Sequence, residues 1–146
     1  MAISRRSGDL TLDDADLLVN AVNTVGLMGK GVALAFRHRW PGIMSSYQHA
    51  CRTGGLTAGG CILLPLDDGR HWAALATKGH WRDPSRLEWI ASGLATLALR
   101  ARTAGILSIA IPPIGCGLGG LDWRDVAPLV AATLGAFDLR LYNAPF

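Results

Sequence analysis

Short apolar runs of strand length alternate along this chain with amphipathic stretches of helix length, and glycine-rich turns follow several of the runs. Strands are expected at residues 2–6, 17–22, 61–66, 72–76, 107–111 and 137–142. Helices are expected between them, within residues 32–40, 41–53 and 83–104 and after residue 122. Strands that alternate with helices predict a mostly parallel sheet covered on both faces, with ligands bound at the carboxyl ends of the strands.

The longest expected helix begins at Asp83-Pro84 and carries a stripe of apolar residues at helical spacing. This stripe predicts an inward face formed by Leu87, Ile90, Ala91, Leu94, Leu97, Ala98 and Ala101. Pro41 is expected at the first position of the second helix, and Asp122 is expected to cap the last one. The residues Asp67-Asp68-Gly69 predict a hairpin turn between the third and fourth strands.

The composition favours a single domain over residues 1–146, because 146 residues with 50% apolar content can bury one core but hardly two. The three cysteines have neither a metal-ligand spacing nor an even number, so we expect no metal site and no disulfide framework. We also expect no cofactor. No apolar segment approaches the ~20 residues of a membrane span. We therefore expect a soluble, cytoplasmic monomer without a membrane partner.

The charge pattern singles out two lysines. The net charge of +3 favours a polyanionic partner, and twelve of the fourteen basic residues are arginine. Coding bias explains the overall ratio but not the exceptions, Lys30 and Lys78, which both lie in glycine-containing turns. A base or nucleophile cannot be an arginine, because arginine keeps its proton in proteins.

Three turns after expected strands are rich in glycine and polar residues: 23–31, 77–82 and 113–120. In the expected architecture all three lie on one rim of the sheet. The run from Gly115 to Gly120 satisfies GxGxxG between a strand and a helix, which indicates either a phosphate-binding turn or only a tight turn. No GxxxxGK[ST] motif is present, so the sequence gives no support for nucleotide triphosphate hydrolysis.

Lys78 directly follows an apolar strand and precedes Gly79, His80, Trp81 and Arg82. A lysine in that place serves as a nucleophile or base, or it extends past Trp81 to solvent. Trp81 stacks on a base or only packs, and His80 is more often a hydrogen-bonding neighbour than a catalyst. Cys116 could be a thiol nucleophile, although a small filler fits its surroundings better.

The turns together resemble one known family, the macrodomains, and the resemblance covers nearly the whole chain. It rests on Gly8-Asp9-Leu10, Leu18-Val19-Asn20-Ala21-Val22-Asn23, Val25-Gly26-Leu27-Met28-Gly29-Lys30-Gly31-Val32-Ala33 and Ile111-Pro112-Pro113-Ile114-Gly115-Cys116-Gly117-Leu118-Gly119-Gly120-Leu121-Asp122-Trp123. Within the family, the runs from Thr77 to Arg86 and from Gly119 to Trp123 are most similar to the DarG type, the antitoxins that remove ADP-ribose from thymidine in DNA.

The resemblance implies a three-layer α/β/α macrodomain with a central mixed, mostly parallel sheet and ADP-ribose in the rim crevice. It implies that Asp9 contacts the adenine amino group, that Asn23 contacts the distal ribose, and that Lys78, helped by Asn23 and His80, acts on that ribose. The residues implied to bind ADP-ribose are Asp9, Leu10, Asn23, Gly26, Met28, Gly29, Gly31, Val32, Thr77, Pro113, Ile114, Gly115, Cys116, Gly117, Leu118 and Gly119.

The resemblance thus predicts an ADP-ribosyl glycohydrolase acting on ADP-ribosylated DNA and opposing a cognate ADP-ribosyltransferase toxin. The alternatives are hydrolysis of ADP-ribose on another base, a protein carboxylate or an acyl group, or binding of ADP-ribose without turnover. Macrodomains that act on glutamate carry an aspartate where this chain has Gly119, which disfavours the carboxylate. The antitoxins also carry a toxin-binding domain, so the chain is expected to be either part of a longer protein or a free-standing hydrolase.

Overall fold

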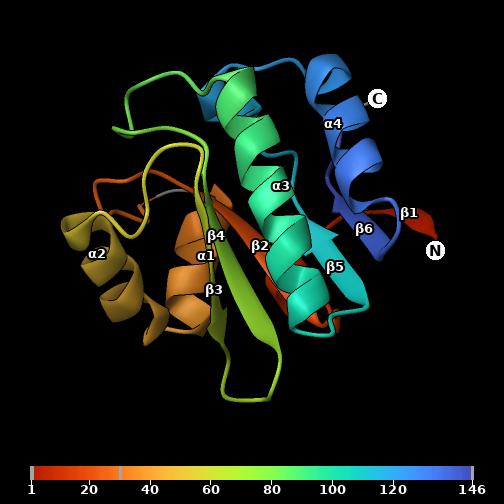
Figure 1. The fold of residues 1–146 in the computed structure, drawn as a ribbon, viewed down its shortest axis with the longest axis horizontal. Helices are drawn as coiled ribbons and strands as arrows, with labels where there is room; N and C mark the ends of the chain where they lie inside the picture. The colour runs from red at the N-terminus through yellow and green to blue at the C-terminus, as the bar shows by residue number, and fades with distance from the viewer. Residues whose placement is uncertain (1, 30, 146) are drawn as a thin grey trace.

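The sheet of the computed structural model has the strand order β1-β6-β5-β2-β4-β3, and the model describes residues 2–29 and 31–145 (Figure 1). All neighbouring strands are parallel except the hairpin pair β3 and β4. The strands are β1 (Ile3–Arg6), β2 (Leu17–Val22), β3 (Cys61–Pro65), β4 (His71–Ala76), β5 (Ser108–Ile111) and β6 (Asp138–Tyr142). The helices are α1 (Gly31–Arg39), α2 (Ile43–Thr53), α3 (Leu87–Thr103) and α4 (Trp123–Leu134), with 3₁₀ turns η1 (Leu10–Leu12) and η2 (Gly117–Gly119).

Helices cover both faces of the sheet, which confirms the predicted three-layer α/β/α architecture. Alternate residues of β2 face opposite sides: Leu17 and Val19 pack with α3 and α4, whereas Leu18 and Val22 pack with α1 and α2. Each face therefore has its own apolar core. In the part of the chain that the structure describes, no helix is long and apolar enough to cross a membrane.

The start of α3 differs from the prediction, because the helix begins at Leu87 and not at Asp83. The backbone N–H of Ser85 donates to the carbonyl of Gly119 (2.9 Å), and Arg86 is extended at φ −122° and ψ 139°, so these residues cannot continue a helix. The second helix likewise begins at Ile43, after a turn that contains Pro41.

The buried stripe of α3 also differs in two positions, because Leu87 and Ala91 are exposed. Helical residues advance by about 100° each, which puts Ala91 just outside the arc around Ile90 and Leu94, and leaves Leu87 in the first turn with little to cover it. Gly93 is buried instead, and a Cβ there would lie 2.7 Å from Leu75. The Asp122 cap of α4 and the 67–69 turn are as predicted.

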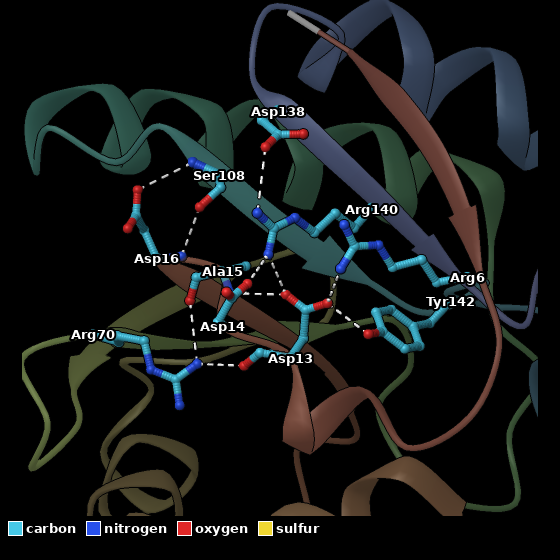
Figure 2. A network of polar contacts seen from close by, with 10 residues as sticks. All are labelled: Arg6, Asp13, Asp14, Ala15, Asp16, Arg70, Ser108, Asp138, Arg140 and Tyr142. Carbon is cyan, nitrogen blue, oxygen red and sulfur yellow. Dashed lines mark hydrogen bonds and ion pairs between the residues drawn. The ribbon is translucent and has the colours of Figure 1, made fainter.

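The linker between η1 and β2 is fixed by a polar network around the buried carboxylate of Asp13 (Figure 2). One oxygen of this carboxylate accepts hydrogen bonds from Ala15 N (2.8 Å) and Arg140 Nη1 (2.6 Å). The other accepts from Arg6 Nη1 (3.0 Å) and the Tyr142 hydroxyl (2.5 Å). Four donors thus compensate the loss of hydration of one buried charge.

The same linker is bonded to the neighbouring strands and hairpin (Figure 2). The Asp16 carboxylate accepts from the backbone N–H groups of Leu107 (3.0 Å) and Ser108 (3.2 Å), just before and at the start of β5. Arg70, from the β3–β4 hairpin, donates to the carbonyl of Asp13 (2.5 Å). The backbone N–H of Asp13 donates to Leu10 O (3.0 Å), so the network also fixes η1.

Replacing Asp13 by asparagine is expected to lower the free energy of unfolding by about 3 kcal/mol, because it removes the buried charge partner of Arg140 and leaves that guanidinium only the more exposed carboxylates of Asp14 and Asp138. Burial raises the pKa of Asp13, but the hydrogen bonds from Tyr142 and Arg140 outweigh it and hold the pKa below 3.8. The contribution of the charge is therefore complete above pH 3.8 and is lost as the pH falls below that value.

Urea unfolding of the wild type and Asp13→Asn between pH 3 and pH 7 measures this difference. The matched control is Asp14→Asn, because Asp14 also bonds Arg140 but its side chain is 91% exposed. We expect the control to change stability by at most ~1 kcal/mol. Equal losses of stability in Asp13→Asn and Asp14→Asn would contradict this role of the buried Asp13 charge. A difference in stability between the wild type and Asp13→Asn that does not shrink at low pH would contradict it as well.

Candidate active site

Three loops meet at the carboxyl ends of β2, β4 and β5, as the sequence predicted. We call residues 23–31 the first loop, 77–86 the lysine segment and 113–120 the glycine loop. Two backbone hydrogen bonds join them: Thr24 N donates to Gly79 O (2.8 Å), and Ser85 N donates to Gly119 O (2.9 Å). The lysine segment therefore bridges the other two loops. Figure 1 shows the segments after β4 and β5 reaching the start of α3 together.

Asn23 shapes the first loop from its buried position at the end of β2. Its Oδ1 accepts from the backbone N–H groups of Val25 (3.0 Å) and Gly26 (3.2 Å), and its Nδ2 donates to Leu27 O (3.0 Å). Tyr47 of α2 lies with its hydroxyl 2.7 Å from Asn23 O and 2.9 Å from Oδ1. These partners fix the orientation of the amide, and one N–H of Nδ2 remains for a ligand.

Lys78 is half-buried at the carboxyl end of β4, directly after the buried Thr77. Thr77 N donates to Val22 O (3.1 Å), which keeps this end of β4 level with the end of β2. Among the described residues, none forms a hydrogen bond or ion pair with the Lys78 ammonium. The nearby carboxylate of Asp83 is turned instead toward the backbone N–H of His80 (3.1 Å). Lys78 is thus a cation that the fold leaves available.

The hydrogen bonds of His80 define its tautomer. Its Nδ1 accepts from the backbone N–H of Arg82 (3.0 Å), so a neutral His80 carries its proton on Nε2. In this arrangement the exposed nitrogen is a donor and cannot accept a proton. The predicted part of His80 in catalysis is therefore restricted to donating a hydrogen bond.

Trp81 is 42% exposed and contacts the side chains of its two sequence neighbours. The His80 ring lies 5.1 Å from the Trp81 ring at an angle of 31°, and the Arg82 guanidinium lies 4.5 Å from the Trp81 ring centroid. This cluster of His80, Trp81 and Arg82 begins only two residues after Lys78. An exposed cluster of aromatic rings and a guanidinium is suited to stacking against a nucleobase.

The glycine loop depends on glycine at two positions. At Gly115 φ is +75°, and a Cβ would lie 2.9 Å from Ile90 and from Leu121. At Gly119 a Cβ would lie 2.5 Å from Ser85 Oγ.

The Cys116 thiol of the same loop is not activated as a nucleophile. Burial raises the pKa of this thiol, and the nearby charge of Asp122 raises it further.

A hollow of about 330 Å³ lies between η1 and the start of α1. Its lining is Gly8, Asp9, Leu10, Gly31, Val32 and Ala35. Asp9 uses Oδ1 to accept from Thr11 N (2.9 Å) and Thr11 Oγ1 (2.6 Å), which leaves Oδ2 for another donor. Asn143 fixes Gly8 with hydrogen bonds of 3.0 and 2.9 Å. An apolar floor with a carboxylate at its margin suits an adenine ring and its amino group.

A larger hollow of about 500 Å³ lies elsewhere, between α2, β3 and Arg100 of α3. It contains none of the predicted site residues, so size alone does not identify the functional site. Within residues 2–29 and 31–145, no group of three His, Cys, Asp or Glu side chains is arranged to hold a metal ion.

The other predicted binding residues fall into two groups. The buried ones are Leu10, Met28 and Ile114, whose side chains belong to the cores, together with Gly26 and the polar Thr77. Residues that are partly or fully exposed on the loops are Gly29, Gly31, Val32, Pro113, Cys116, Gly117 and Leu118. Lys30 lies outside the described residues.

Sequence reasoning missed three residues that organise the site. Tyr47 lies within the helix expected at residues 41–53, and no pattern indicates that its hydroxyl reaches Asn23. Thr24 and Ser85 were not singled out, although their backbone N–H groups hold the lysine segment in place. No local pattern indicates these contacts, because Asp83-Pro84 is itself typical of a helix start and the bond from Ser85 to Gly119 is long-range.

The fold defines an α/β/α domain with three loops at the carboxyl ends of its strands and a hollow of about 330 Å³ between η1 and the start of α1. The model of the Macro domain family matches residues 19–130. This chain belongs to that family.

Its relatives include the DNA ADP-ribosyl glycohydrolase of Mycobacterium tuberculosis, which is 46% identical over 127 residues, 85% of this chain and 36% of the relative. The DNA ADP-ribosyl glycohydrolase of Thermus aquaticus is 40% identical over 134 residues, 90% of this chain and 37% of the relative. The chain thus spans little more than a third of the length of these curated relatives.

Among solved structures, the macrodomain of Mycobacterium tuberculosis DarG has a TM-score of 0.92 and 41% identity, over 99% of both chains. Thermosipho africanus DarTG in complex with ADP-ribose has a TM-score of 0.85 and 32% identity, over 92% of this chain and 39% of that one. The resemblance to DarG macrodomains that the sequence suggested is therefore confirmed.

Proposed function

We propose that this chain is a DNA ADP-ribosyl glycohydrolase that removes ADP-ribose from a nucleobase, with thymidine in single-stranded DNA as the expected substrate. It would thereby reverse a DNA ADP-ribosyltransferase toxin. The observation that carries the proposal is Lys78, whose unpaired ammonium stands between two loops that can hold the nucleotide. The relatives named DNA ADP-ribosyl glycohydrolase support the same activity.

The hollow beside Asp9 is proposed to take the adenine, with Oδ2 accepting from the adenine amino group. The first loop leads into the N-terminus of α1, and the glycine loop offers backbone N–H groups from the opposite side. Both are suited to the diphosphate, because helix N-termini and glycine-rich turns present donors to anions. The distal ribose then lies toward Asn23 and Lys78, which follow the adjacent ends of β2 and β4.

The proposed reaction breaks the bond between the anomeric carbon of the distal ribose and the base nitrogen. Lys78 either attacks that carbon with its amine, or uses its ammonium to protonate the sugar ring oxygen and open the ring. Water supplies the hydroxyl that ends on the anomeric carbon and the proton that ends on the base. Free ADP-ribose and the unmodified base result, and Lys78 is regenerated.

The position of Gly119 favours a base over a protein carboxylate as the leaving group. A side chain at this position would meet Ser85, so the glycine loop provides no second acidic group near Lys78. The cluster of His80, Trp81 and Arg82 supplies an exposed aromatic surface that a nucleobase can stack on and a glutamate cannot. The net charge of +3 also suits a DNA strand.

Lys78→Ala is expected to slow release of ADP-ribose from an ADP-ribosylated thymidine oligonucleotide by about 10³-fold, because it removes the acting group. Lys78→Arg should not restore turnover, since arginine keeps the charge but cannot exchange its proton. Chromatographic detection of free ADP-ribose measures the rate, and calorimetry with ADP-ribose checks that both variants still bind within a few fold.

Two results would contradict the proposal. Tight binding of ADP-ribose with no release by the wild type would identify a reader domain, and equal release by Lys78→Ala would reject the residue. Faster release from a protein glutamate or from another base than from thymidine would assign the other substrate.

Trp81→Ala is expected to raise KM for the oligonucleotide about tenfold, in line with ~1–3 kcal/mol of stacking per base. The affinity of Trp81→Ala for free ADP-ribose should not change, because free ADP-ribose does not carry the DNA base that is proposed to stack on Trp81. The matched control is Trp89→Ala on α3, whose ring pairs with Arg86 at 5.0 Å in the same way. A similar KM change in the control, or weaker binding of free ADP-ribose by Trp81→Ala, would contradict this role.

A further inference from the structure

Ser85 carries a buried hydroxyl beside the glycine loop. The residue is 5% exposed, and its Oγ has no hydrogen-bond partner among the described residues. It lies in the lysine segment just before α3, seven residues after Lys78. Buried hydroxyl groups are rarely left without a partner, because losing their hydration costs stability.

The hydroxyl is not needed for the contact between the lysine segment and the glycine loop. That contact is made by the backbone, from Ser85 N to Gly119 O at 2.9 Å, and alanine would make it equally well. Ser108 shows the opposite case, because its Oγ accepts from Asp16 N (2.8 Å) and so contributes to the fold. Stability alone therefore gives no reason for serine at position 85.

The hydroxyl points at the backbone of the glycine loop. The position that a Cβ of Gly119 would take lies 2.5 Å from Ser85 Oγ and 3.1 Å from Ser85 Cβ. A glycine at position 119 leaves room for the hydroxyl. The N–H groups of Gly119 and Gly120 already donate to Cys116 O (3.2 Å) and Gly117 O (3.0 Å), so the adjoining peptide groups offer the hydroxyl carbonyl acceptors. A small shift of the loop would give the hydroxyl a partner.

We propose that Ser85 is a positioning residue, whose hydroxyl hydrogen-bonds the glycine loop when the loop closes on the distal-ribose end of bound ADP-ribose. The bond couples the loop to the lysine segment, so that binding of the nucleotide and placement of Lys78 occur together. The inference rests on the proposed binding of ADP-ribose in this crevice.

The test compares Ser85→Ala with the wild type in two measurements, thermal unfolding of the free protein and calorimetric binding of ADP-ribose. We expect the melting temperature of free Ser85→Ala to be unchanged or higher, because an unpaired buried hydroxyl is removed. We expect its affinity for ADP-ribose to be about tenfold weaker, which corresponds to ~1.4 kcal/mol. Ser108→Ala should show the reverse, a lower melting temperature with unchanged affinity.

A second pair of variants tests the contact itself. Gly119→Ala should weaken ADP-ribose binding, because its methyl group would displace Ser85. Adding Ser85→Gly to Gly119→Ala removes the clash but not the need for the hydroxyl. The double variant should therefore have the melting temperature of the wild type, while its affinity for ADP-ribose is as low as that of Ser85→Ala.

Two results for Ser85→Ala would overturn the inference. An unchanged affinity for ADP-ribose would show that the hydroxyl has no role in binding, and a melting temperature that falls by several degrees would show that its role is purely structural. Wild-type affinity in the double variant would overturn it as well. These outcomes are distinct from failure of the proposed function, in which the wild type itself would not bind ADP-ribose, and both proposals would fall.

Discussion

The two backbone hydrogen bonds that attach the lysine segment to its neighbours are the constraint on which the site depends. Gly79 O receives the N–H of Thr24, and Gly119 O receives the N–H of Ser85. Both bonds use main-chain groups, so they locate Lys78 whatever the side chains around it do. The extended backbone of Arg86, at φ −122° and ψ 139°, ends the segment, so α3 begins only at Leu87.

The polar network of the 13–16 linker supports the other end of the crevice. Asp13 bonds β1 and β6 through Arg6, Arg140 and Tyr142, and its backbone N–H bonds Leu10 O in η1. The turn that carries Asp9 is therefore anchored to the sheet through a buried charge. The hollow beside Asp9 and the lysine segment are thus positioned by separate sets of bonds, so a substitution can alter one of them while the other is kept.

Much of this arrangement was predictable from the sequence, because it follows from local patterns. The apolar run at 17–22 gave β2 at its observed bounds, and glycine after β2, β4 and β5 placed the three loops on one rim. The resemblance to macrodomains supplied the roles of Asp9, Asn23 and Lys78, which spacing alone leaves open. The start of α3 was missed because a long-range bond from Ser85 overrides the helix signal of Asp83-Pro84. The hydroxyl of Tyr47 on Asn23 joins elements 24 residues apart, and no periodicity encodes such a contact.

The central claim is that the fold holds the Lys78 side chain against the sugar at the far end of a bound nucleotide. A crystal structure with ADP-ribose tests it most directly, through the distance from Lys78 Nζ to the anomeric carbon of the distal ribose. The account predicts a near-attack distance of ~3–3.5 Å, or a direct hydrogen bond from Nζ to the ring oxygen of that ribose. A Lys78 that points into solvent, in a protein that still hydrolyses its substrate, would contradict it.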